Sequence, residues 1–377
     1  MKENLIVIFG GASSEHDVSI ISALQAINYI DVDYYNVIPV YIDQNNVWYT
    51  GKILKDITNY KNLNTKRLKQ VSIIAGQKYL YQKFLFGYYK KLKIDCALVV
   101  MHGINGEDGK VMSLLDLAGI PYQCSNTCES GICLDKTIFK DYLNGLKVNN
   151  VKGVGITQYL YNNNPEKIYQ LLENKIEYPM IVKPATQGSS IGIKVCHNRQ
   201  QLEDAIVGSF ELGEKVLIEQ FLDDITEINV AIVRDDDKLI VSELEQPLKS
   251  SDILSFENKY LNESNSMQGI SRIIPAPIDD KIKSKIKDMA IKVYENLNLK
   301  GVVRFDFILN KDNVYINEVN SIPGSLAYYL FEPLGIDYNK LINILIKNTY
   351  LYEKNTKKKI HRYFSNILDG TNISIKK

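Results

Sequence analysis

Short apolar runs alternate with segments of helical spacing in the first third of the chain. Apolar runs at 5–9, 37–42 and 96–101 predict buried strands, and the apolar positions within 18–29 predict a helix after the first of them. Apolar strands separated by helices are typical of a parallel sheet with both faces covered. Ligands of such sheets usually bind in the loops at the carboxyl ends of the strands.

Two polar loops, 10–17 and 102–109, follow predicted strands and are therefore candidate ligand loops. Further along, apolar residues spaced from Ile282 to Leu297 predict an amphipathic helix, and a hairpin is predicted at 302–319. We predict an α/β fold with α+β character in the C-terminal part. The predicted domains are 1–135, 136–222 and 223–350, followed by a basic, solvated tail at 351–377.

The composition narrows the classes of partner. The 377 residues carry a formal net charge of +1, which points to neither nucleic acid nor an acidic membrane surface. No apolar run approaches the roughly 20 residues that a membrane span needs. The strand at 5–9 leaves no room for a signal peptide, so we expect a cytoplasmic protein with free thiols. Cys124, Cys128 and Cys133 lack the paired C-x2-C spacing of zinc sites and are expected to be small buried residues.

The predicted hairpin is the first candidate for chemistry. Arg304 and Asp306 share one face of its first strand, and Glu318 and Asn320 share one face of the second. If the turn is Lys311-Asp-Asn313, Asp306 lies opposite Glu318 and Arg304 lies opposite Asn320. Oxygen ligands of this kind suit Mg²⁺, and the guanidinium could neutralise a transferred phosphoryl group or an oxyanion. The alternative is a surface ladder of cross-strand ion pairs.

A Gly- and Ser-rich loop is the second candidate. It follows a predicted strand that ends at Lys183, and its residues 188–192 offer backbone N–H groups and hydroxyls to a phosphate. It is neither a Walker A loop, because the lysine precedes the glycines, nor a Rossmann fingerprint, because no helix opens there. The alternative is a plain hairpin connection. Lys136 and Lys259 are further candidate cations, with surface lysines as the alternative.

Two carboxylates lie around the connection between neighbouring predicted strands. Glu219 is a polar residue on an otherwise apolar strand, and Glu227 opens the next strand. Such a pair could bind the amino group and ribose hydroxyls of a nucleotide, or it could be solvated.

Together, these motifs resemble the D-alanine–D-alanine ligase family over nearly the whole chain. Eight motifs stand in the family's order: GGASSEHDVS (10–19), HGINGEDG (102–109), IPY (120–122), LDK (134–136), VKP with GSSIG (182–184 and 188–192), ENKY (257–260), RFD (304–306) and NEVNSIPG (317–324). The resemblance implies an ATP-grasp fold behind an N-terminal parallel-sheet domain, with ATP between the central and C-terminal domains.

The resemblance also implies the ligand contacts. ATP would contact Lys136, Lys183, Glu219, Leu222, Glu227 and Lys259. Two Mg²⁺ or Mn²⁺ ions would bind Asp306, Glu318 and Asn320. Glu15, with Ser189 and Tyr260, would hold the first D-alanine beneath a mobile loop at about 249–269. Arg304 and the backbone N–H of Gly324 would form the oxyanion hole.

The implied reaction has two steps and serves peptidoglycan precursor synthesis. The carboxylate of one D-alanine attacks the γ-phosphate of ATP, and the amine of a second then attacks the resulting acyl phosphate. Members of the family are commonly dimeric through the N-terminal region, so a homodimer is one expectation.

One position departs from the family pattern. Tyr329 stands where these ligases normally have a serine that helps to hold the carboxylate of the second D-alanine. A phenol could donate a hydrogen bond there from a different distance, and Lys259 is available to hold the carboxylate by charge. Tyr260 argues for an amine rather than D-lactate as the acceptor. D-alanine is the expected acceptor, with D-serine or another amino acid as the alternative, and a nucleotide-binding protein without turnover as the third hypothesis.

Overall fold

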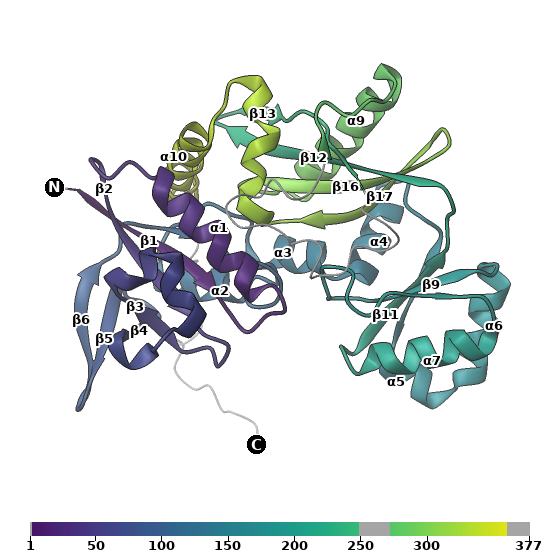
Figure 1. Ribbon diagram of the computed structural model, residues 1–377, viewed down its shortest axis with the longest axis horizontal. Helices are drawn as coiled ribbons and strands as arrows, with labels where there is room; N and C mark the ends of the chain where they lie inside the picture. The colour runs from purple at the N-terminus through teal and green to yellow at the C-terminus, as the bar shows by residue number, and fades with distance from the viewer. Residues whose placement is uncertain (1, 249–271, 360–377) are drawn as a thin grey trace, which may run out of the picture.

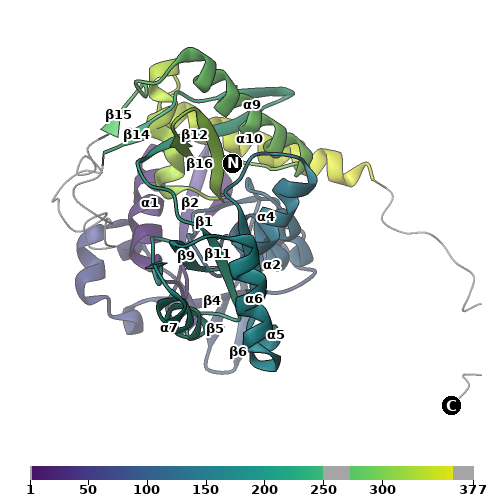
Figure 2. The ribbon, with the colours of Figure 1, turned by 90° about the vertical axis from the view of Figure 1, so that its right-hand side faces the viewer.

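The computed structural model describes residues 2–248 and 272–359 and contains three main sheets (Figure 1). In Figure 1 the N-terminal sheet lies at the left, the C-terminal sheet at the upper right and the central sheet at the lower right. After a turn of 90°, the helices of the central part face the viewer below the C-terminal sheet (Figure 2). The α/β fold class predicted from the sequence is confirmed.

The N-terminal sheet has seven strands. From edge to edge they are β6 (Gly87–Lys93), β5 (Tyr79–Phe84), β4 (Lys69–Ile73), β3 (Trp48–Thr50), β2 (Tyr35–Ile42), β1 (Glu3–Gly10) and β7 (Cys96–Val99). The apolar β1 pairs in parallel with β2 and β7, as predicted, because its continuous apolar run is buried on both faces. The other strand pairs are antiparallel, and the connections between them are short except for the one from β3 to β4.

Three helices belong to the core of this sheet: α1 (His16–Tyr29), α2 (Lys110–Ala118) and α10 (Tyr338–Lys357). Three short helices connect β3 to β4: η1 (Lys52–Lys55), η2 (Ile57–Asn62) and η3 (Thr65–Arg67). Although α10 comes late in the chain, its Leu341 and Leu345 are buried in the same core as β1. The predicted start of a solvated tail at residue 351 is wrong, because α10 continues to Lys357 and its Glu353 pairs with Lys78.

The central sheet is antiparallel. Its order is β10 (Lys194–Cys196), β9 (Met180–Pro184), β11 (Lys215–Gln220) and β8 (Gly153–Thr157). Its helices are α5 (Gln158–Asn163), α6 (Pro165–Lys175) and α7 (Arg199–Phe210). The side chains of Asn164 and Asn198 cap α6 and α7, and Leu172 and Leu202 bury the apolar faces of these helices against the sheet.

The C-terminal sheet is also antiparallel. Its order is β13 (Lys238–Val241), β12 (Ile225–Asp235), β16 (Val303–Asn310) and β17 (Asn313–Asn320). Its core includes residues of α9 (Asp280–Asn296), α3 (Thr127–Leu134) and α4 (Lys136–Gly145). The remaining elements are β14 (Gln246–Pro247), β15 (Arg272–Ile273), η5 (Gly324–Leu330) and η6 (Glu332–Leu334). The predicted domain boundary at 136 does not follow the packing, because Phe139 and Leu143 of α4 are buried in this C-terminal core.

The β16–β17 hairpin reaches the predicted register by a different route. Asn310 pairs with Asn313, so the turn contains two residues rather than the three predicted. A bulge then leaves Asn317 without a partner in the register, because Phe307 pairs with Ile316 and Asp306 with Glu318. The bulge offsets the shorter turn, so Asp306 still lies opposite Glu318 and Arg304 opposite Asn320.

The cysteines are all free, as expected from the sequence. Cys124 and Cys133 are buried, but Cys128 is exposed, so its predicted burial is wrong. It lies in the first turn of α3, on the helix face away from Cys133. Among the described helices, none combines the length and apolar character needed to cross a membrane.

Candidate active site

Side chains from all three parts of the chain line two adjoining pockets. The larger pocket is lined by residues that include Lys136, Lys183, Ser189, Glu227, Arg304, Asp306 and Glu318. The adjoining pocket shares several of these and adds Glu15, Glu107 and Asn320. The structure therefore brings most of the predicted site residues together. Glu219, Leu222 and Gly324 line neither pocket. Lys259, Tyr260 and the predicted lid at 249–269 lie outside the described residues.

Arg304 and Asp306 form a two-point ion pair on β16. Arg304 Nε lies 2.7 Å from Asp306 Oδ1, and Arg304 Nη2 lies 2.8 Å from Asp306 Oδ2. Across the hairpin, the Asn320 amide donates to Asp306 Oδ2 at 2.9 Å. Burial raises the pKa of Asp306, Arg304 opposes this shift, and the carboxylates of Glu318 and Glu245 add to it. The guanidinium therefore neutralises a carboxylate that burial would otherwise disfavour.

The hairpin offers donors that fit a divalent cation. Asp306, Glu318 and Asn320 supply two carboxylates and one amide from paired positions on β16 and β17. Over residues 2–248 and 272–359, no group of three or more His, Cys, Asp or Glu side chains could hold a metal by itself. Mg²⁺ commonly takes one or two carboxylates and completes its octahedron with water and substrate phosphates, so this donor set fits it.

The two predicted phosphate-binding lysines approach the hairpin from different elements, Lys183 from β9 of the central sheet and Lys136 from the first residue of α4. Lys183 Nζ, on β9, donates to Asn317 Oδ1 at 3.1 Å, so the bulge residue orients this lysine. Lys136 Nζ donates to the carbonyl of Gln187 at 2.7 Å and lies 3.7 Å from Glu318 Oε2. Lys136 thus lies beside the predicted metal ligand Glu318, and Lys183 contacts the residue that precedes it.

Glu219 holds lysines in place in this structure. Its carboxylate lies 2.6 Å from Lys183 Nζ and 2.6 Å from Lys140 Nζ, and all three side chains are at most a tenth exposed. Burial acts to raise the pKa of Glu219, but Lys183 and Lys140 overcome it and lower the pKa. Lys140 escaped the sequence analysis because a single lysine on an amphipathic helix carries no pattern. Contact of Glu219 with adenine remains a prediction.

The predicted contact between Glu15 and Ser189 is formed. Ser189 Oγ donates to Glu15 Oε1 at 2.7 Å, although the two residues lie 174 positions apart. The preceding Gly188 allows this approach, because a Cβ there would lie 3.0 Å from Glu15 Oε1. Ser189 itself takes the left-handed conformation, with φ 53°. The carboxylate therefore faces the central loop from the N-terminal part.

The N-terminal part also fixes the backbone around Gly324. Glu107 accepts from the N–H of Gly103 at 2.8 Å and from that of Ile322 at 3.2 Å. His102 Nδ1 lies 2.7 Å from the Ile322 carbonyl, so this nitrogen carries the proton and donates. Burial lowers the pKa of His102, which favours the neutral ring. Sequence reasoning placed both residues in a family motif but gave neither a role.

A left-handed turn follows Gly324. Ser325, Leu326 and Ala327 have φ values of 49°, 52° and 47°, a conformation that L-residues adopt at a cost of about 1–2 kcal/mol each. The Ser325 N–H donates to Ser22 Oγ at 2.9 Å, and all three residues are buried. At Gly324 an added Cβ would meet no heavy atom within 4 Å, so a substrate can approach this backbone.

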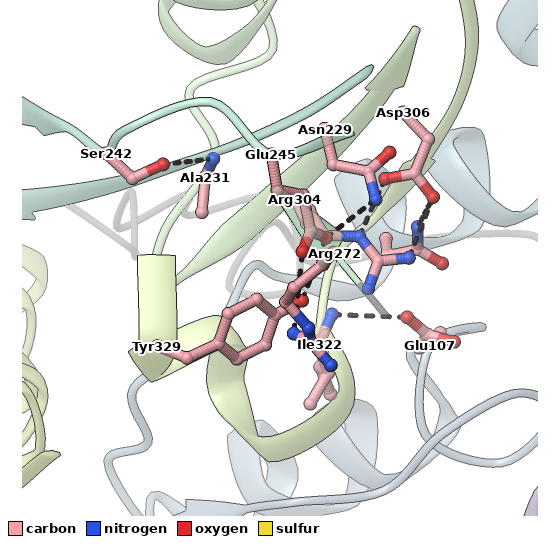
Figure 3. A network of polar contacts seen from close by, with 11 residues as sticks. Glu107, Asn229, Ala231, Ser242, Glu245, Arg272, Arg304, Asp306, Ile322 and Tyr329 are labelled. Carbon is pink, nitrogen blue, oxygen red and sulfur yellow. Dashed lines mark hydrogen bonds and ion pairs between the residues drawn. The ribbon is translucent and has the colours of Figure 1, made fainter. Parts of the chain in front are cut away.

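The hydroxyl of Tyr329, which could have donated to the acceptor carboxylate, has a different partner in this structure. Its hydroxyl donates to Glu245 Oε1 at 3.0 Å, and that carboxylate also accepts from Asn229 Nδ2 at 2.9 Å (Figure 3). Arg272 lies over the Tyr329 ring, with Cζ 4.0 Å from the ring centroid, and its Nη1 lies 3.4 Å from Glu245 Oε2. The phenol proton is therefore committed to Glu245 rather than directed at an acceptor carboxylate. Glu245 and Arg272 were missed because they lie on separate elements outside the recognised motifs.

Comparisons with known proteins agree with this geometry. The family D-ala D-ala ligase N-terminus matches residues 4–125, and the family D-ala D-ala ligase C-terminus matches residues 143–347. A D-alanine–D-alanine ligase of Thermosipho africanus is 37% identical over 97% of this chain and 98% of its own. Another, from Caldicellulosiruptor bescii, is 35% identical over 96% of this chain and 98% of its own.

Solved structures show the same fold. The VanG D-Ala:D-Ser ligase of Enterococcus faecalis has a TM-score of 0.79 and 26% identity, covering 93% of this chain and 100% of that one. The fold is that of an ATP-grasp ligase, an enzyme that forms a peptide bond with the use of ATP. Within that class, the chain belongs to the D-alanine–D-alanine ligase family.

The buried Glu107 carboxyl, which accepts from the N–H groups of Gly103 and Ile322, predicts a pH-dependent contribution to stability. Burial, with help from Glu15, raises the pKa of Glu107 to about 8. The folded protein then holds a proton that the unfolded chain releases above about pH 4, so this contribution is lost as pH rises toward 8. We expect Glu107→Gln to remove a slope of up to about 1.4 kcal/mol per pH unit between pH 5 and 7. Urea unfolding across this range measures the slope.

Glu107→Gln should also lower the free energy of unfolding at low pH. The amide nitrogen of the glutamine would face a backbone N–H, and the lost hydrogen bond costs about 1–3 kcal/mol. The exposed Glu332→Gln is the matched control and should keep the wild-type slope. Parallel pH profiles for wild type and Glu107→Gln would contradict the assignment.

Proposed function

We propose that this chain joins two D-alanine molecules into D-alanyl-D-alanine with consumption of ATP, for peptidoglycan precursor synthesis. The observation that carries the proposal is one pocket in which Glu15 and Ser189 meet Arg304 and Glu318. Glu15 supplies the carboxylate that an amino-acid ammonium needs, and Arg304 supplies a cation for an oxyanion. Family membership gives this combination its reaction.

In the first step, the carboxylate of the donor D-alanine attacks the γ-phosphate, which forms an acyl phosphate and releases ADP. Lys136 and Lys183 hold the phosphates, and Glu15 holds the donor ammonium so that its carboxylate faces them. Mg²⁺ or Mn²⁺ ions held by Asp306, Glu318 and Asn320 would supply further neutralisation of phosphate charge. Asp306, which pairs with Arg304 in this structure, would turn toward a bound metal ion.

In the second step, the acceptor amine attacks the acyl carbon, a proton is released and phosphate leaves. Arg304 and the N–H of Gly324 would stabilise the tetrahedral oxyanion. The clamp on Ile322 and Ser325 supports this role, because it fixes the backbone on both sides of Gly324. A donor set held in advance is worth more than one that reorganises during the reaction.

A cytoplasmic location is part of the proposal, since ATP and free thiols belong to that compartment. We also propose a homodimer formed through the N-terminal part. The tip between β5 and β6 supports it, because Leu85 is 89% exposed and Phe86 is 87% exposed beside the edge strand β6.

The dimer proposal predicts a mass of twice 43.0 kDa in solution. Light scattering after size exclusion measures it, and replacing Leu85 and Phe86 by serine should shift the mass toward the monomer. The same replacement at the exposed Leu334 is the control. A wild-type monomer at micromolar concentration would end the proposal.

The reaction itself is tested with purified protein, ATP, Mg²⁺ and D-alanine. Phosphate release and D-alanyl-D-alanine formation in equal amounts are expected, and absence of both would overturn the proposed function. D-serine and D-lactate added in competition decide the acceptor. The resemblance to the VanG structure makes D-serine the second candidate, and a mixed product dominated by D-alanyl-D-serine would favour it over D-alanine.

The metal ligands predict a sharp difference between two aspartates of one hairpin. Asp306→Asn keeps the shape but removes a carboxylate, so we expect kcat to fall at least about 100-fold, equivalent to about 2.7 kcal/mol. Asp312 lies in the exposed turn, and Asp312→Asn should retain activity within about twofold. Steady-state phosphate release measures both, and equal activities would refute the role of Asp306.

A further inference from the structure

The acceptor amino acid brings its own carboxylate into a crowded pocket, an argument that rests on the function proposed above. The wall already contains the carboxylates of Asp306, Glu318 and Glu245. A further carboxylate can leave water only if a cation receives it. The described cations on this wall are Lys136, Lys183, Arg304 and Arg272.

The first three have other tasks in the pocket. Lys183 and Lys136 lie beside the predicted metal ligands on the phosphate side. Arg304 forms the two-point pair with Asp306 and faces the reacting carbonyl in the proposed mechanism. Arg272 is the cation for which neither the motifs nor the mechanism gives a use.

Arg272 is held in a defined orientation. The Cζ atom of its guanidinium lies 4.0 Å from the centroid of the Tyr329 ring, a cation–π contact. Its Nη1 lies 3.4 Å from Glu245 Oε2, and its backbone belongs to β15, which pairs with β14. A guanidinium has five N–H donors in a planar fork that matches the geometry of a carboxylate, so it can hold a carboxylate at two points.

The support beneath Arg272 is rigid. Glu245 is 3% exposed, and its backbone exchanges two hydrogen bonds with Asn229, of 2.9 and 3.0 Å. The Asn229 side chain and the Tyr329 hydroxyl both donate to its carboxylate. Asn229 lies opposite Asp306 on the neighbouring strand, so this platform is tied to the sheet that carries the metal ligands. Figure 3 shows the platform beside Arg304 and Asp306.

We propose that Arg272, stacked on Tyr329 and oriented by Glu245, binds the α-carboxylate of the acceptor amino acid. The Tyr329 ring supports the guanidinium by a cation–π contact and does not bind the acceptor itself. Glu245 offsets the positive charge of Arg272 before the acceptor binds. The acceptor is therefore a free α-amino acid, and a molecule with the same amine but no carboxylate is a poor substrate.

The test separates the acceptor from the donor half of the reaction. Hydroxylamine captures the acyl phosphate as a hydroxamate and needs no carboxylate site, so hydroxamate formation reports the donor step and the fold. We expect Arg272→Gln to raise the D-alanine concentration that half-saturates dipeptide formation at least about tenfold. The ratio of dipeptide to hydroxamate should fall by a similar factor at subsaturating D-alanine. Arg272→Lys should lie in between, because it keeps the charge but loses the fork.

A second acceptor tests the chemistry directly. D-alaninamide keeps the amine and lacks the carboxylate, so the wild type should use D-alanine at least about tenfold more efficiently, and Arg272→Gln should lose this preference. Arg199→Gln is the matched control, because Arg199 also pairs with a glutamate and lies over a tyrosine ring, 5.2 Å from the Tyr169 centroid. It should keep the wild-type preference.

Two variants of Tyr329 show whether its ring supports Arg272 or its hydroxyl binds the acceptor. Tyr329→Phe keeps the ring and should change the acceptor KM by less than about threefold, whereas Tyr329→Ala should raise it at least about tenfold. Equal losses in both variants would mean that the hydroxyl is the ligand and would overturn the proposal. So would an unchanged acceptor KM in Arg272→Gln. A wild type that forms neither dipeptide nor hydroxamate would instead refute the proposed function.

Discussion

The hydrogen bonds by which the N-terminal part holds the backbone at Ile322 are the constraint on which the site depends. Glu107 and His102 bind both polar groups of that residue, the N–H and the carbonyl, and Ser22 receives the N–H of Ser325. These hydrogen bonds offset the cost of the left-handed turn that follows. They also join α1, which begins directly after Glu15, to the backbone around Gly324. The proposed donor and oxyanion positions therefore belong to one connected piece of structure.

Several charged groups in and beside the pocket have partners of opposite charge. Arg304 pairs with Asp306, Glu219 pairs with both Lys183 and Lys140, and Glu245 lies beside Arg272. Such pairing keeps several ionised side chains tolerable in a partly buried wall. In the proposed mechanism, ligands would meet charged side chains that these partners already orient.

Much of the fold and of the candidate site could be predicted from local sequence. Period-two alternation assigned the faces of Arg304, Asp306, Glu318 and Asn320, and apolar runs located the parallel centre of the first sheet. What could not be predicted depends on contacts between distant segments. No local pattern reveals that α10 completes the N-terminal core, that Lys140 shares Glu219 with Lys183, or that Tyr329 lies against Arg272 and Glu245. These arrangements follow from packing, which a single sequence encodes only collectively.

The bulge at Asn317 has a consequence for how this hairpin can vary among relatives. The two-residue turn and the extra residue in β17 shift the register by equal and opposite amounts. A three-residue turn without a bulge would leave the faces of the predicted metal ligands in the same register. Insertion at the turn should therefore be tolerated only together with deletion near Asn317, because either change alone would turn Glu318 and Asn320 to the opposite face. Paired length changes of this kind would leave a trace in which alignment gaps at the two places occur together.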